Sequence, residues 1–192
     1  MAWTPEDRAP RSHRDVTEAK RKGLIIVYTG DGKGKTTAAL GLAFRALGRR
    51  YRVAVGQFIK GKWKTGEGAF AKELAGRVDF FSMGDGFTWI TKNYEQDVAS
   101  ARRAWAKCLE LLMDERYQLV IFDELSYVIK YNFLSVEEVL EGLKRKPPRT
   151  HVVITGRDAP AELIEVADLV TEMREIKHPY KAGIKAQPGV DY

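Results

Sequence analysis

A glycine-rich segment with two lysines has the composition of a phosphate-binding loop. Residues 29–37 read Thr-Gly-Asp-Gly-Lys-Gly-Lys-Thr-Thr and follow an apolar run, residues 24–28. Backbone amides that wrap around phosphate oxygens need positive φ angles and a close approach of the chain, which glycine allows. Lys35 and the amides that open the next helix supply positive charge. The sequence therefore predicts a phosphate site here, with a merely glycine-rich turn as the alternative.

The spacing of this loop is one residue shorter than usual. The common motif sets a glycine four residues ahead of Gly-Lys-Ser/Thr, and Thr29 fills that position here. The nearest glycine is Gly30. The altered spacing argues against an ordinary ATPase or kinase.

Two acids end a second apolar run. Residues 119–122 are Leu-Val-Ile-Phe, and Asp123 and Glu124 follow them. This pattern is typical of a Walker B strand, whose end lies beside the phosphate loop, so Asp123 would hold the Mg²⁺ shell together with the Thr36 hydroxyl. Glu124 would activate water or bind a ribose hydroxyl. An acidic strand end with a structural role is the alternative.

Two further loops carry candidate site residues. Arg157 follows another expected strand, so we expect it at the same carboxyl edge, in reach of a phosphate or ribose, although it would also be ordinary as a surface arginine. Phe87 and Trp89 lie in a glycine-rich loop after residues 78–83. Two exposed rings beside a nucleotide site would suit a flat, apolar ligand, and the alternative is that they fold back onto the core.

Six short apolar runs alternate with helical stretches, which predicts a mainly parallel α/β sheet. The expected strands span residues 24–29, 53–58, 78–83, 119–122, 152–155 and 169–172. The expected helices span residues 36–47, ended by Gly48, residues 95–115, a segment that a capping box starts at Ser135, and residues 160–166.

Length and composition favour one domain in the cytoplasm. The chain has 192 residues, a net charge of +6 and a single cysteine, Cys108, in a helical pattern that indicates buried packing. No apolar run reaches the length of a membrane span, and the first residues lack the apolar core of a signal peptide. We expect residues 1–22 to be a mobile arm and residues 23–192 to be the domain.

Basic residues cluster at two places, residues 45–64 and 144–149. Such clusters could face nucleic acid, a polyphosphate or an acidic protein. We do not expect nucleic acid as a partner, because no aromatic-interleaved basic sheet motif or DNA-binding helix pattern accompanies them.

Taken together, these motifs resemble the P-loop type of ATP:corrinoid (cob(I)alamin) adenosyltransferases. The resemblance covers nearly all of the chain from Gly23 onward, and it rests on motifs that occur together. They are residues 30–37, 57–61, 66–67, 86–89, 123–125, 155–157 and the ending 185–192. In that family, Co(I) of a reduced corrinoid attacks the 5′-carbon of ATP and triphosphate leaves. ATP lies in the loop in the reverse of the usual direction.

The resemblance implies roles residue by residue. The nucleotide would be bound by Gly30, Asp31, Gly32, Lys33, Gly34, Lys35, Thr36, Thr37, Glu124 and Arg157, with Lys35 on the triphosphate charge. Thr36 and Asp123 would hold Mg²⁺. Phe87 and Trp89 would lie against the lower face of the corrin ring and keep its base or a water off the cobalt.

The resemblance also implies a RecA-like P-loop fold, a six-stranded sheet with flanking helices, and a homodimer whose amino-terminal arm closes over the corrinoid. A flavoprotein is a candidate reductant, and either cob(I)yrinic acid a,c-diamide or cob(I)alamin would be the acceptor. Two alternatives stay open from the residues. One is a RecA-like ATPase or nucleotide kinase, and the other is a corrinoid carrier without turnover.

Overall fold

The computed structural model of the chain describes residues 21–58, 65–74, 76–83 and 93–191. Within these ranges six strands form a single sheet. The strands are β1 (Ile25–Thr29), β2 (Val53–Gln57), β3 (Val78–Ser82), β4 (Leu119–Asp123), β5 (His151–Thr155) and β6 (Leu169–Glu172). Their order is β3-β2-β4-β5-β1-β6, and each neighbouring pair of these strands is parallel.

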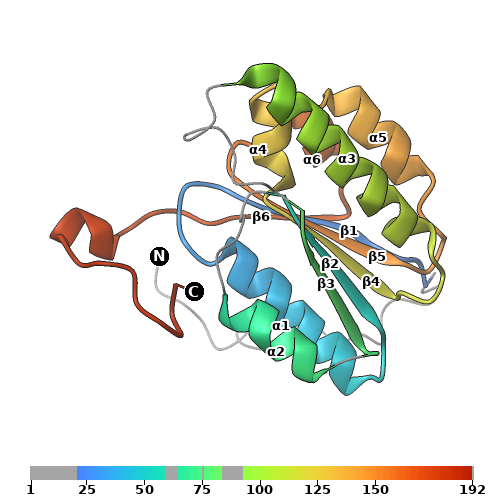
Figure 1. Ribbon diagram of the computed structural model, residues 1–192, viewed down its shortest axis with the longest axis horizontal. Helices are drawn as coiled ribbons and strands as arrows, with labels where there is room; N and C mark the ends of the chain where they lie inside the picture. The colour runs from blue at the N-terminus through green and yellow to red at the C-terminus, as the bar shows by residue number, and fades with distance from the viewer. Residues whose placement is uncertain (1–20, 59–64, 75, 84–92, 192) are drawn as a thin grey trace, which may run out of the picture.

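Helices cover both faces of this sheet (Figure 1). One face carries α1 (Lys35–Gly48) and α2 (Gly66–Glu73). The other carries α3 (Tyr94–Met113), α4 (Leu125–Lys130), α5 (Val136–Lys144) and α6 (Ala161–Val166). Parallel strands need such crossover helices, and the arrangement buries both faces of the sheet.

The central strands are apolar because they are covered on both sides. All five residues of β2 and of β4 are buried. Alternate residues of β4 serve opposite cores: Phe122 packs with Trp105 on the α3 side, whereas Ile121 packs with Ala39 on the α1 side. Two cores therefore hold the strands in register, and their carboxyl ends meet at one edge.

The predicted elements agree closely with the observed ones. Each expected strand is present to within one residue at either end, and the sheet is parallel throughout the described chain. The capping box at Ser135 is confirmed: its hydroxyl accepts from the Glu138 amide, and the Glu138 carboxylate accepts from the Ser135 amide. One boundary was wrong. Gly48 is the last residue of α1 rather than its stop, and Arg50 takes the positive φ of 62°.

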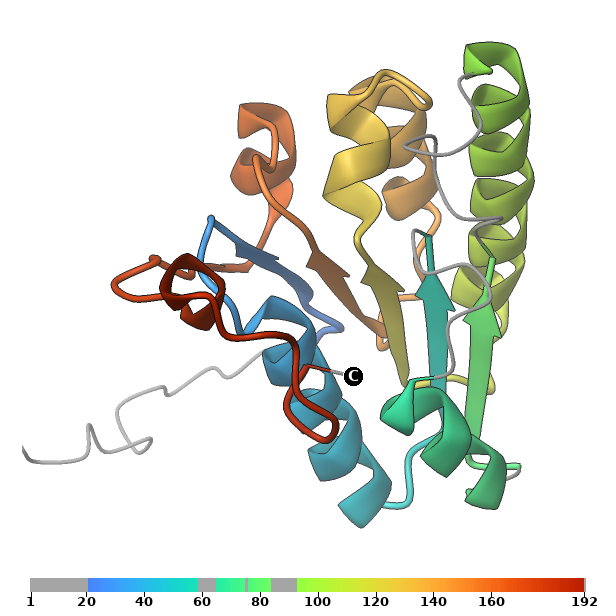
Figure 2. The same cartoon turned by 60° about the vertical axis from the view of Figure 1, so that its left-hand side comes forward.

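The chain after β6 forms a long excursion that sequence patterns did not predict. It leaves the sheet, forms the 3-10 helix η3 (Pro179–Ala182) and returns toward α1 (Figures 1 and 2). Two parts of this excursion contact the loop between β1 and α1. Among the described residues, no helix is both long enough and apolar enough to span a membrane.

Candidate functional site

The predicted phosphate loop joins β1 to α1 in a conformation that depends on glycine. Gly30 has a φ of 93° and Gly34 a φ of 110°, both in the left-handed region. Gly34 is the N-cap of α1 and provides no side-chain hydrogen bond to the first turn, which also contains no acidic residue. The first amides of α1 are therefore suited to bind an anion.

Lys35 lies inside the loop rather than in solvent. Its side-chain Nζ donates hydrogen bonds to the carbonyl oxygens of Gly30, at 2.6 Å, and Gly32, at 2.7 Å, and the residue is only 8% exposed. Burial lowers the pKa of Lys35, and the nearby Glu124 carboxylate partly opposes that shift. Two of the three ammonium N–H groups thus fix the charge at the centre of the loop.

Asp123 joins the ends of three strands and the start of α1. One carboxylate oxygen accepts from the hydroxyls of Thr36 at 2.8 Å and Thr155 at 2.7 Å. The other accepts from the side-chain Nε2 of Gln57 at 2.8 Å. The residue is 1% exposed, so this network compensates the carboxylate for lost hydration.

This arrangement fits the Mg²⁺ site of a P-loop protein. Mg²⁺ is usually held by one or two protein oxygens together with water and substrate phosphates, rather than by an all-protein cage. The Thr36 hydroxyl and the Asp123 carboxylate supply such a pair, already in contact. Among the described residues there is no group of three or more His, Cys, Asp or Glu side chains placed to bind a metal.

Glu124 and Arg157 flank the loop on neighbouring strands. Glu124 has a left-handed φ of 64°, and its amide donates to the Thr155 hydroxyl at 2.9 Å, so its side chain leaves the strand end at a fixed turn. Arg157 follows Gly156, where a Cβ would come within 2.7 Å of Ser126. A guanidinium nitrogen of Arg157 lies 3.9 Å from the carboxylate of Asp31, which is a residue of the loop.

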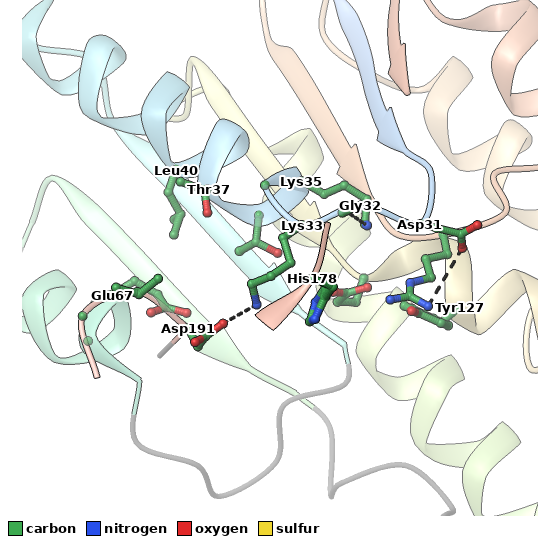
Figure 3. Close-up of a pocket in the computed structure, with 17 residues that line it drawn as sticks. Asp31, Gly32, Lys33, Lys35, Thr37, Leu40, Glu67, Tyr127, His178 and Asp191 are labelled. Atoms are coloured by element: carbon green, nitrogen blue, oxygen red, sulfur yellow. Dashed lines mark hydrogen bonds and ion pairs between the residues drawn. The ribbon is translucent and has the colours of Figure 1, made fainter. Parts of the chain in front are cut away.

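These residues share one cavity of about 920 Å³ (Figure 3). Nine of the predicted nucleotide-binding residues line it, namely Asp31, Gly32, Lys33, Gly34, Lys35, Thr36, Thr37, Glu124 and Arg157. Gly30 and Asp123 do not line it and act from behind, through the bonds to Lys35 and Thr36. Most of the residues predicted to bind the nucleotide therefore lie around one cavity. Phe87 and Trp89 lie outside the described residues.

Other lining residues were not assigned a role from the sequence. They are Leu40, Gly66, Glu67, Tyr127, His178, Gly189, Val190 and Asp191. Glu67 and Asp191 lie at one end of the cavity, and Tyr127 lies at the other with Asp31 (Figure 3). Gly66, Glu67 and the chain ending had a signal, because they belong to the motifs that carry the resemblance. Tyr127 and His178 had none, since helical spacing and an isolated histidine are common in any protein.

The structure gives a second reason for two of the loop glycines. The amide of Gly32 donates to the carbonyl of Met173, at 2.7 Å, in the chain that follows β6. A Cβ on Gly30 would come within 2.5 Å of that same carbonyl, and one on Gly32 within 2.7 Å of Arg174. The glycines therefore leave room for the chain that departs from β6, and the Gly32 amide is already hydrogen-bonded to it.

The described cavity lining contains no serine or cysteine. Cys108 lies on α3 and is fully buried in the core, and burial raises the pKa of its thiol well above the usual value, which agrees with the predicted packing role.

Comparison with known proteins agrees with this geometry. The sequence model of the family "ATP:corrinoid adenosyltransferase BtuR/CobO/CobP" matches residues 21–192. A corrinoid adenosyltransferase from Sinorhizobium sp is 49% identical over 96% of this chain and 87% of its own length. The corrinoid adenosyltransferase of Escherichia coli K12 is 46% identical over 89% of this chain and 86% of its own.

A solved structure supports the fold independently. The flagellar accessory protein FlaH from Methanocaldococcus jannaschii superposes with a TM-score of 0.53 over 83% of this chain and 74% of its own, at 16% identity. That likeness concerns the fold alone. It confirms the predicted RecA-like α/β architecture with a parallel six-stranded sheet and flanking helices.

Proposed function

The chain belongs to the ATP:corrinoid adenosyltransferase family, and we propose that the cavity around the P-loop is where it performs adenosyl transfer. The family membership establishes an enzyme that transfers the adenosyl group of ATP to a reduced corrinoid. One observation supports this location: Thr36 and the buried Lys35 line the cavity, and Asp123 contacts the Thr36 hydroxyl from behind it.

The reaction needs no nucleophile from the protein. The electron pair on Co(I) forms the bond to the 5′-carbon of ATP. The bond between that carbon and the triphosphate oxygen breaks, and triphosphate leaves with the two electrons of the broken bond. The protein must then align two substrates and stabilise the charge that develops on the leaving oxygen. A lining of amides, lysines and hydroxyls without serine or cysteine suits this task among the described residues.

We assign the triphosphate to the loop. Lys35 and the first amides of α1 face the cavity and are held by the loop itself, so little reorganisation accompanies the reaction. Thr36 and Asp123 would hold Mg²⁺, which when bound neutralises phosphate charge. Lys33 and Thr37 also line the cavity and complete the positive and polar surface.

Glu124 and Arg157 are assigned to the nucleoside end. Both leave the carboxyl ends of neighbouring strands, and both line the cavity. A carboxylate is a good acceptor for ribose hydroxyls, and a guanidinium can donate to ribose or to the adjoining phosphate. The assignment places the 5′-carbon between these groups and the loop.

Phe87 and Trp89 are assigned to the lower face of the corrin ring. Their loop follows β3, which belongs to the same parallel sheet as β4 and β5, the strands that Glu124 and Arg157 follow. Two aromatic rings can exclude an axial base or water, and loss of an axial ligand changes the potential of the metal. The rings would exclude a water as well as a nucleotide base, so they do not require the corrinoid to carry a lower nucleotide. We therefore propose both cob(I)alamin and cob(I)yrinic acid a,c-diamide as acceptors.

We propose a cytoplasmic homodimer that receives electrons from a flavoprotein, with residues 1–22 as a lid over the corrinoid; residues 1–20 of that arm lie outside the described chain. Apolar side chains are exposed on and near the edge strand β6, and a second copy of the chain would bury them in the proposed homodimer. They are Ile164, Val166, Leu169, Val170 and Ile176.

The acceptor range and the nucleoside assignment are testable together. The two corrinoids are reduced chemically and offered separately with ATP and Mg²⁺, and adenosylation is followed by the change in the corrinoid absorbance spectrum. We expect both to react. Glu124→Ala should raise the ATP dissociation constant much more than that of either corrinoid. An effect on corrinoid affinity alone would contradict the nucleoside assignment.

A further inference from the structure

The chain after β6 is attached to the P-loop at two successive loop residues. At its near end the Met173 carbonyl accepts from the amide of Gly32 at 2.7 Å. At its far end the Asp191 carboxylate forms an ion pair with the ammonium of Lys33 (Figure 3). The segment 173–191 thus forms a closed strap that begins and ends on the triphosphate site.

The two attachments differ in how easily they open. The Met173 attachment is a backbone hydrogen bond that continues the pairing of β6 with β1, where the Met173 amide also donates to the Thr29 carbonyl at 2.8 Å. The Asp191 attachment is a single ion pair with a lysine whose side chain is 48% exposed. Pairs of this kind are weak and are screened by salt. The far end is therefore the one that a competing anion would release.

The turn before Asp191 holds its carboxylate toward the loop. The Gln187 amide donates to this carboxylate at 2.8 Å, and the Asp191 amide donates back to the Gln187 carbonyl at 2.8 Å. Gly189 permits the turn through a φ of 75°. The Asp191 side chain is only 12% exposed, and Asp191 lines the same cavity as the loop. A fixed negative charge thus projects into a site suited to phosphates.

That charge is present at neutral pH. The hydrogen bond from Lys33 lowers the pKa of Asp191 below its usual value, and the hydrogen bond from the Gln187 amide adds a smaller effect in the same direction. His178 caps η3 through its Nδ1, which accepts from the Tyr180 amide, and it also lines the cavity. A carboxylate here and a bound triphosphate would repel each other while competing for Lys33.

We propose that Asp191 acts as an internal competitor for the triphosphate: it pairs with Lys33 until phosphate displaces it, and it reclaims Lys33 when the product leaves. The proposal rests on the assignment of the triphosphate to the loop. In turnover, Asp191 weakens the hold on triphosphate and thereby speeds its release. ATP also has to displace Asp191, but ATP gains further contacts at the nucleoside end.

The test uses inorganic triphosphate with Mg²⁺ as the probe and measures its binding by titration calorimetry. Asp191→Asn removes the charge, while the amide oxygen can still accept from Gln187, so the turn is retained. We expect this variant to bind triphosphate roughly threefold to tenfold more tightly than the parent. A matched control is Glu175→Gln, which removes an acid from another ion pair of the same strap, with Lys181, at a residue that does not itself line the cavity. It should leave the affinity within about 1.5-fold.

A double-mutant cycle decides whether the effect passes through Lys33. In a Lys33→Gln background, Asp191→Asn should tighten binding much less than in the parent. Unchanged or weaker binding by Asp191→Asn would overturn the proposal, as would equal tightening in the Lys33→Gln background or with Glu175→Gln. Corrinoid is absent from this experiment, so its outcome is independent of whether the parent enzyme adenosylates a given corrinoid.

Discussion

The hydroxyl of Thr36 donates a 2.8 Å hydrogen bond to the carboxylate of Asp123, although 87 positions separate them in the chain. The bond joins the first turn of α1 to the end of β4, two elements that different motifs predicted separately. It places a hydroxyl and a carboxylate together at the loop, which is the requirement for the Mg²⁺ that accompanies ATP.

The first prediction concerns this pair. Asp123→Asn should weaken the Mg²⁺-dependent part of ATP binding by about tenfold or more, because an amide is a much poorer ligand for a hard cation than a carboxylate. Calorimetric titration of ATP with and without Mg²⁺ measures that part. Thr155→Val is the matched control, since it removes another bond to the same carboxylate oxygen without removing the charge. Equal loss in both variants would assign Asp123 to structure alone.

The second prediction concerns Lys35. Lys35→Ala should lower kcat by a hundredfold or more, because removing one preorganised donor to a developing charge costs roughly 3 to 4 kcal/mol of transition-state stabilisation. Single-turnover adenosylation with chemically reduced cobalamin measures the step. Lys144→Ala, which removes an exposed lysine of α5, is the control and should match the parent. Activity of Lys35→Ala within threefold of the parent would show that the charge comes from elsewhere.

The third prediction separates two roles for Phe87 and Trp89. If they exclude the lower ligand, replacing both with alanine should impair the reaction that starts from Co(II) and a weak reductant much more than the reaction that starts from Co(I). If they pack in the core, each truncation costs roughly 3 to 5 kcal/mol of stability. Activity by the two routes and the thermal midpoint are measured for the double variant. Equal losses by both routes with a large fall in midpoint would remove the rings from the mechanism.

The fourth prediction concerns stability and pH. The Nδ1 of His151 accepts from the Leu24 amide at 3.1 Å, so it must be unprotonated. Burial lowers the pKa of His151 below its usual value of 6.5, and the charge of Lys146 contributes a smaller effect in the same direction. The folded state then binds fewer protons than the unfolded state, so stability falls as pH drops below about 6.5 and through the folded pKa.

Urea unfolding at pH 7.5 and 5.5 measures this loss. His151→Asn keeps an acceptor near the Leu24 amide without a titrating group, and it should lose less stability than the parent over the same interval. The same loss in parent and variant would show that other groups cause the pH dependence.

Sequence patterns predicted the strands and the loop because both depend on local chemistry. Apolar runs of five residues specify strands buried on both faces, and a glycine-rich turn before a helix specifies an anion site. The contact between Thr36 and Asp123 could be anticipated because parallel strands end at a common edge.

The strap could not be anticipated in the same way. Its course depends on one backbone bond from Gly32 to Met173 and on one ion pair from Lys33 to Asp191, neither of which produces a periodic pattern. The short helices α2 and α4 were missed for a related reason. They are eight and six residues long, too short to show a clear helical repeat.

The identity of the phosphate product tests the central claim most directly. The enzyme is incubated with ATP, Mg²⁺ and chemically reduced cobalamin, and the phosphate products are separated and compared with the amount of cobalt–carbon bond formed. The account predicts intact triphosphate in equal amount to adenosylated corrinoid, because attack occurs at carbon and not at phosphorus. Stoichiometric ADP or pyrophosphate would contradict it.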